Sequence, residues 1–212
     1  MADFAELRAR MVDRQLRRRG IADERVLSAM GAVPREEFVP AELRRAAYSD
    51  SALPIGGGQT ISQPWVVAAI CQALELHGDE KVLEVGTGSG YSAAVLGRLA
   101  AEVFGIERHE PLAQGAAAAL AQVGATNVRV LVGDGSRGYP EQAPFAAIAV
   151  HASAPAPPPA LIEQLAADGR LVVPVAGPES DDLTLLRREG ERIEATPLAP
   201  CRFVPLIGEQ GF

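Results

Sequence analysis

The feature that most constrains the fold is the stretch from residue 81 to residue 91, KVLEVGTGSGY. A short apolar segment stops at three glycines in alternate positions, Gly86, Gly88 and Gly90, and an apolar run follows them. Apolar residues bounded by glycines predict a buried strand, and the run after the turn predicts a helix. Because glycine has no Cβ atom, its backbone adopts positive φ angles and lies directly against a ligand. The stretch therefore predicts a strand, a ligand-contacting turn and a helix, although an ordinary tight turn uses the same residues.

The spacing of the three glycines separates two kinds of nucleotide site. Sites for nicotinamide and flavin dinucleotides use G-x-G-x-x-G, in which the turn receives a pyrophosphate. Residues 86–90 read G-x-G-x-G instead. The shorter turn suits a nucleoside that carries no phosphate. It points to S-adenosylmethionine as the cofactor and disfavours a nicotinamide-dependent dehydrogenase.

Two carboxylates follow the next two predicted strands. Glu107 ends the strand 102–107, and its distance from Gly86 in the sequence is close to the ~20 residues that separate a glycine turn from a ribose-binding acid in doubly wound folds. Asp134, with Gly135 after it, follows a strand over 128–133. We predict that Glu107 accepts from ribose hydroxyls and that Asp134 accepts from an adenine amino group. The competing interpretations are a solvated acid for the first and a turn-initiating aspartate for the second.

Strands and helices alternate from residue 81 onward. The predicted strands are 81–86, 102–107, 128–133, 146–151 and 170–176, and the predicted helices are 89–100, 110–123 and 158–167. Such alternation is typical of a parallel sheet with crossover helices. Two further β-like runs, 182–188 and 193–207, predict an antiparallel edge. The expected fold is α/β, a doubly wound, mostly parallel sheet of the Rossmann-like class I methyltransferase type.

The N-terminal part reads as a helical layer. Apolar positions at helical spacing predict a helix over residues 4–19, and Asp23 is a suitable N-cap for a second helix. Residues 40–62 are expected to be irregular. Ser62 as a cap, with a proline in the first turn, then predicts a helix to about Leu76. We expect one domain over the whole chain, divided into a helical cap (1–55), a cofactor-binding core (56–180) and a C-terminal hairpin (181–212).

Composition limits the partners and the compartment. The chain of 212 residues carries 20 basic and 27 acidic residues, a formal net charge of −7. Nucleic-acid binding depends on neutralising phosphates, so this charge disfavours a nucleic-acid partner. The N-terminus lacks the apolar core of a signal peptide, no apolar run approaches the ~18 residues of a membrane span, and neither the cysteines nor the histidines have metal-ligand spacing. We expect a cytoplasmic monomer without a bound metal or membrane partner.

Six segments resemble the protein-L-isoaspartate O-methyltransferase family, in the family's order. They are VPREEF (33–38), LPIGGGQTISQP (53–64), VLEVGTGSGY (82–91), GDG (133–135), PALIEQL (159–165) and RFVPL (202–206). Many methyltransferases share the glycine-rich turn, whereas GQTISQP and RFVPL are far more specific to this family.

The resemblance implies methyl transfer from S-adenosylmethionine to the α-carboxylate of L-isoaspartyl residues in damaged proteins and peptides. The ester then closes to a succinimide, which hydrolyses partly to normal aspartate. By motif match, Ser62 takes the position of the family's active-site serine. The cofactor-binding positions fall on Thr60, Gly86, Gly88, Gly90, Glu107, Asp134 and Gly135.

Three positions depart from the family pattern. Ala146 replaces an acid, His151 replaces a threonine near the reacting centre, and Trp65 stands where tyrosine or histidine is usual. Two alternatives therefore stay open. One is an aspartate O-methyltransferase dedicated to a single peptide partner, and the other is a cofactor-binding relative that has lost turnover.

Overall fold

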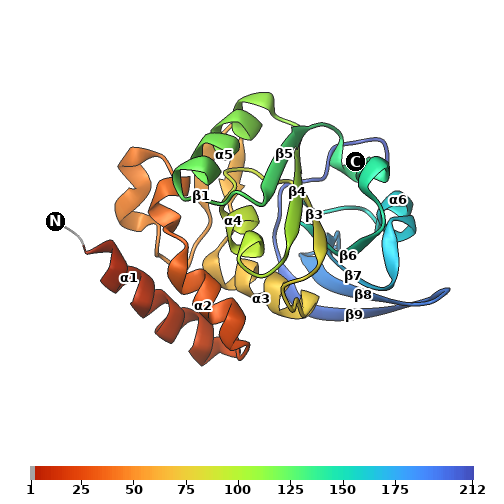
Figure 1. Ribbon diagram of the computed structural model, residues 1–212, viewed down its shortest axis with the longest axis horizontal. Helices are drawn as coiled ribbons and strands as arrows, with labels where there is room; N and C mark the ends of the chain where they lie inside the picture. The colour runs from red at the N-terminus through yellow and green to blue at the C-terminus, as the bar shows by residue number, and fades with distance from the viewer. Residues whose placement is uncertain (1–2) are drawn as a thin grey trace.

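The computed structural model describes residues 3–212, which form one seven-stranded sheet and a separate hairpin (Figure 1). In spatial order the sheet contains β5 (Val128–Val132), β4 (Glu102–Glu107), β3 (Lys81–Val85), β6 (Phe145–Val150), β7 (Leu165–Val175), β8 (Asp181–Glu189) and β9 (Arg192–Cys201). The first five strands are parallel, and β8 is antiparallel to both of its neighbours. The predicted α/β class, with a mostly parallel sheet and an antiparallel C-terminal edge, is confirmed.

Helices cover both faces of the sheet. One face carries α3 (Pro64–Leu74), α4 (Tyr91–Gly97) and α5 (Glu110–Gln122), and the other carries α6 (Pro159–Glu163) with two short 3-10 turns. Successive strand residues supply the two faces in turn, so Val82 packs in one core and Leu83 in the other. The chain order reverses between β3 and β6. In such sheets ligands bind at the carboxyl ends of the strands, beside the reversal.

The N-terminal layer packs against α3 and α4. Helix α1 (Phe4–Met11) continues through a π-helical and a 3-10 turn to Arg19, and Gly20 ends it at a φ of 92°. Helix α2 (Glu24–Ala32) is capped by the Asp23 side chain, as predicted. Figure 1 shows these helices at one end of the molecule and the β8–β9 hairpin at the other.

Residues 40–62, predicted to be irregular, contain a hairpin of β1 (Leu53–Gly56) and β2 (Gln59–Ile61). Gly57 and Gly58 form its turn, both at positive φ. A pair of glycines is a hairpin signal, but strands of four and three residues have too little alternation to be recognised. The prediction was wrong because it took the prolines and the glycine run of this segment as signs of irregular structure.

Two predicted boundaries near the C-terminus are also wrong. The helix expected over 158–167 ends at Glu163, because Leu165 already pairs with Phe145 as the start of β7. The strand expected over 193–207 ends at Cys201. Residues beyond it leave the sheet edge and bond to the loop after β6. There Ser153 donates its N–H to the Val204 carbonyl at 2.8 Å and accepts from the Leu206 N–H at 2.7 Å.

Three further observations concern the described residues 3–212 alone. None of their helices is both long enough and apolar enough to cross a membrane. They contain no group of three potential ligands that would hold a metal ion. Cys71 and Cys201 are both free, and Cys71 lies in the core.

Candidate active site

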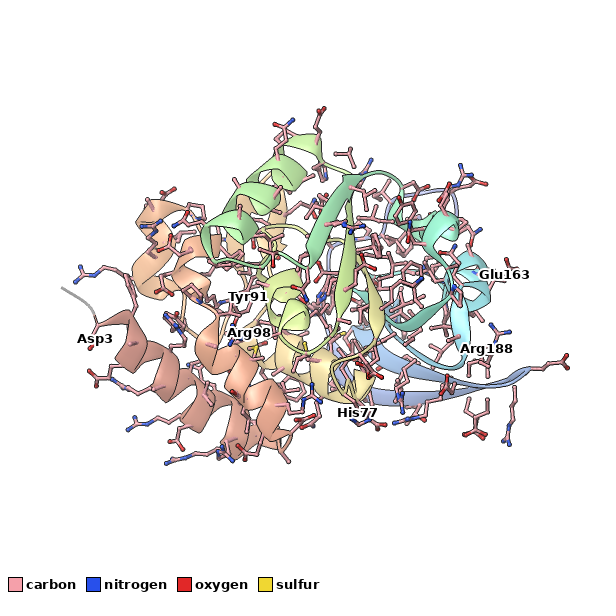
Figure 2. All side chains as sticks on the ribbon, in the orientation of Figure 1. Asp3, His77, Tyr91, Arg98, Glu163 and Arg188 are labelled. Carbon is pink, nitrogen blue, oxygen red and sulfur yellow. The ribbon has the colours of Figure 1, made fainter. Side chains whose placement is uncertain are left out.

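A cavity lies at the carboxyl ends of β3, β4 and β6, where the chain order reverses. Segments far apart in the sequence build its wall: the glycine-rich turn, the strand ends, residues 59–62 and the C-terminal residues 204–207. Because the lining segments are distant in sequence, the cavity depends on how the elements drawn with their side chains in Figure 2 pack together.

Glycine is required at the three positions of the turn for different structural reasons. All have positive φ, at 82° for Gly86, 55° for Gly88 and 89° for Gly90. A Cβ on Gly88 would lie 3.2 Å from the Ile55 side chain, and one on Gly90 would lie 3.2 Å from the Cβ of Ala116. Gly86 and Gly88 line the cavity. Gly90 instead caps α4 and allows this helix to pack closely on α5.

Glu107 ends β4 and lines the cavity, with 5% of its surface exposed. Its Oε2 accepts from the Gly88 N–H at 2.9 Å, and its Oε1 accepts from the His109 N–H at 2.9 Å. Each carboxylate oxygen accepts more than one hydrogen bond. The carboxylate is thus held between the glycine turn and the start of α5, with acceptor capacity left for a pair of ligand hydroxyls.

Ser62 and Thr60 line the cavity from the segment before α3. The prediction that Ser62 caps this helix is wrong: Gln63 occupies the cap position, and no side chain caps the helix. The Ser62 carbonyl accepts from Arg35 Nη2 at 2.8 Å, and the Ser62 hydroxyl makes no hydrogen bond within residues 3–212. The hydroxyl is therefore free to bind a ligand.

Asp134 lies behind the cavity wall. Its Oδ1 accepts from the Ser136 N–H at 2.9 Å and hydroxyl at 2.7 Å, and its Oδ2 accepts from the Glu209 N–H at 2.8 Å. These bonds tie the 3-10 turn after β5 to the C-terminal residues. Of the predicted pair, Gly135 lines the cavity and Asp134 does not. Both Asp134 oxygens bind the protein's own chain, and the adenine contact predicted for this carboxylate stays a prediction.

A buried cluster beside the turn contains two titratable groups: Glu84, to which the sequence analysis gave no role, and His151, which it placed near the reacting centre. Nε2 of His151 lies 2.8 Å from the Ser92 hydroxyl and 3.4 Å from Oε1 of Glu84. Burial raises the pKa of Glu84 to about 8 and lowers the pKa of His151 to about 4. Both groups are uncharged at neutral pH. An acid inside an apolar strand was the sequence signal for Glu84, but its partner comes from β6 and was not predictable.

A second hollow, here called the outer groove, adjoins the cavity. Four residues line both spaces: Thr60, Ser62, His151 and Val204. The groove continues along Trp65, whose ring lies 4.9 Å from the Arg19 guanidinium, and along Arg202. Ser62 and His151 therefore stand at the border where ligands bound in the two spaces would meet.

The cavity contains a glycine turn of the kind that binds a nucleoside, and the outer groove lies beside it. Two adjoining binding spaces are expected of an enzyme that transfers a group from one ligand to another. The order of the sheet, with its reversal beside the turn and its antiparallel edge, identifies the class as a Rossmann-like, class I S-adenosylmethionine-dependent methyltransferase.

The family model described as "Protein-L-isoaspartate(D-aspartate) O-methyltransferase (PCMT)" matches residues 7–211, so the chain belongs to this family. A relative from Koribacter versatilis (strain Ellin345), named protein-L-isoaspartate O-methyltransferase, is 55% identical over 212 residues, which cover 100% of this chain and 96% of the relative. A relative of the same name from Methanoculleus marisnigri is 52% identical over 206 residues, covering 97% and 93%.

Solved structures agree with the fold. One titled protein-L-isoaspartate O-methyltransferase superposes with a TM-score of 0.85 at 27% identity, covering 96% of this chain and 67% of its own. A Plasmodium falciparum protein superposes with a TM-score of 0.82 at 23% identity, covering 98% and 99%. Its title describes a putative protein-L-isoaspartate O-methyltransferase in complex with S-adenosyl-L-homocysteine.

Proposed function

We propose that this chain transfers a methyl group from S-adenosylmethionine to the α-carboxylate of L-isoaspartyl residues in damaged proteins and peptides. The product ester closes to a succinimide, which starts repair. The observation that carries the proposal is the position of Ser62 at the border between the cavity and the outer groove. A cofactor in the first space and a peptide in the second meet at this hydroxyl. The full-length relatives named for this activity support the same reaction.

The chemistry of the cavity wall fits S-adenosylmethionine, which supplies an electrophilic methyl group on its sulfonium. Glu107 offers acceptor oxygens to the ribose hydroxyls, and the turn offers bare backbone for close contact. The proposed cofactor set is Thr60, Gly86, Gly88, Gly90, Glu107, Asp134 and Gly135. Within it, Gly90 and Asp134 act by holding α4 and the turn at Gly135 in place.

The acceptor needs alignment more than activation. An α-carboxyl group has a reference pKa of ~3.5, so it is ionised at neutral pH and requires no general base. Ser62 donates to one carboxylate oxygen and leaves the other oriented toward the methyl group. Buried walls exclude water, and fixed geometry favours in-line displacement. His151, uncharged at neutral pH, borders the acceptor, which needs no base.

A single chain is the proposed active form. The proposed partners are isoaspartyl peptide segments. The net charge of −7 disfavours nucleic acid in that role.

The test uses S-adenosylmethionine and two peptides that differ only by L-isoaspartate or L-aspartate at one position. Mass spectrometry follows the methyl ester and the succinimide. The proposal predicts both products from the isoaspartyl peptide alone. Methylation of neither peptide, by protein that still binds the cofactor, would contradict it and favour a dedicated-partner enzyme or a non-catalytic relative. His151→Thr would then test whether this departure from the family is the cause.

A further inference from the structure

Arg35 is a buried cation in the N-terminal layer. It begins the 3-10 turn Arg35–Phe38, and none of its surface is exposed. Burial lowers the pKa of Arg35 from its ordinary value, but a guanidinium remains protonated in proteins. Moving an ion out of water is costly unless an opposite charge compensates it. A buried cation in this position therefore requires either a compensating negative charge or a functional role.

No carboxylate among residues 3–212 is paired with this guanidinium. Nε of Arg35 donates to the Ala47 carbonyl at 2.7 Å, Nη2 donates to the Ser62 carbonyl at 2.8 Å, and Nη1 has no hydrogen-bond partner in the described residues. The adjacent acid, Glu36, forms its ion pair with Arg8 at 3.2 Å instead. Carbonyl dipoles alone leave the positive charge of Arg35 uncompensated.

The charge contacts the wall of the active site at two points. One is the Ser62 carbonyl, and the other is the Tyr91 ring, whose centroid lies 4.7 Å from the guanidinium carbon. Tyr91 follows the glycine turn directly and lines the cavity. Figure 2 labels Tyr91 at α4, beside the N-terminal layer.

We propose that Arg35 is a positioning residue, which holds the Ser62 backbone and supplies the positive potential in which the acceptor carboxylate binds. This inference rests on the proposed function and adds a buried source of anion attraction in a protein of net charge −7. Coulomb interactions are stronger inside a protein than in water. The same potential repels the sulfonium of S-adenosylmethionine but not the neutral thioether of S-adenosylhomocysteine. Arg35 therefore favours binding of the acceptor carboxylate and disfavours binding of the positively charged S-adenosylmethionine.

The test compares Arg35→Met, which keeps a long side chain without the charge, with Arg35→Lys, which keeps the charge. We expect Arg35→Met to raise the KM of an isoaspartyl peptide by about tenfold, the factor that a unit charge gives at about 10 Å in a protein. The kcat should change less, because the anion and the sulfonium neutralise each other once both are bound. By calorimetry, the Kd of S-adenosylmethionine relative to that of S-adenosylhomocysteine should fall. Arg35→Lys should stay close to the wild type in both readouts.

Arg45→Met is the matched control, since Arg45 is exposed and its loss changes the net charge equally. A purely structural role for Arg35 predicts equal damage in Arg35→Met and Arg35→Lys with an unchanged cofactor ratio, and that result would overturn the proposal. If Arg35→Met does not fold, Arg35→Lys decides alone: a near wild-type KM supports the proposal, and a raised KM in cofactor-binding protein overturns it. The cofactor ratio needs no peptide. It tests Arg35 even if the wild type methylates nothing, a result that would contradict only the proposed function.

Discussion

At the residue scale, the side chains of the site differ in how far the sequence predicts them. The position of Glu107 beside the glycine turn was predictable. A single turn and helix separate the two strands, so the spacing in the sequence also sets the distance in space, and Glu107 accepts from the Gly88 N–H. Ser62 was placed in the correct segment by its motif, but the capping role assigned to it was wrong. Arg35 and Glu84 owe their burial to contacts between distant elements, which a single sequence does not reveal.

Ser62→Ala should lower kcat for methyl transfer by a factor equivalent to about 2–3 kcal/mol, the loss typical of one oriented hydrogen-bond donor at a reacting oxygen. Cofactor affinity should be unaffected. Steady-state kinetics with an isoaspartyl peptide provide the measurement, and Ser51→Ala, at an exposed serine, is the control. A wild-type kcat in Ser62→Ala would remove this hydroxyl from the mechanism.

The buried pair of Glu84 and His151 predicts how stability depends on pH. The pKa of Glu84 is about 8 in the folded protein against an ordinary 4.5, so its favourable contribution to the free energy of unfolding is lost as pH rises through 8. His151, with a pKa of about 4 against 6.5, acts in the opposite direction, and its stabilising contribution is complete above pH 6.5. Between pH 6.5 and 8, therefore, the titration of Glu84 lowers the free energy of unfolding as pH rises, and His151 no longer contributes to the slope.

Glu84→Gln should therefore flatten the fall in the free energy of unfolding between pH 6.5 and 8. Urea denaturation at both pH values measures this slope. The exposed Glu141→Gln should keep the slope of the wild type. Parallel curves for Glu84→Gln and the wild type would mean that Glu84 does not hold its proton in the folded state.

At the element scale, strongly patterned elements were predicted and short ones were not. The strand 102–107 was predicted with its observed bounds, and the helix expected over 110–123 differs by one residue. The hairpin at residues 53–61 and the early start of β7 depend on pairing with partners elsewhere in the chain. Local pattern gives the period of an element, whereas its ends are set by tertiary contacts.

Gly88→Val tests the glycine turn as an element. A side chain at this position would require a φ of +55° and would meet Ile55 at 3.2 Å, filling the space between the backbone and the ligand. Cofactor binding measured by calorimetry should be abolished. Gly115→Val, at a helical glycine whose Cβ would meet nothing within 4 Å, should bind the cofactor normally. Unchanged affinity in Gly88→Val would mean that the cofactor site lies elsewhere.

At the scale of the whole molecule, the site depends on segments from both ends of the chain. The N-terminal layer contributes the cation at Arg35, the sheet contributes Glu107 and the glycine turn, and residues 204–207 complete the wall. Periodicity predicted the sheet but could not bring these segments together. The motifs GQTISQP and RFVPL indicated one family, but only the structure shows that they line the same cavity.

A crystal structure with S-adenosylhomocysteine and an isoaspartyl peptide bound together tests the central claim most directly. The account predicts ribose hydroxyls within hydrogen-bond distance of Glu107, the α-carboxylate at the Ser62 hydroxyl, and the cofactor sulfur facing a carboxylate oxygen between them. A cofactor outside the cavity, or an isoaspartyl carboxylate bound away from Ser62, would contradict it.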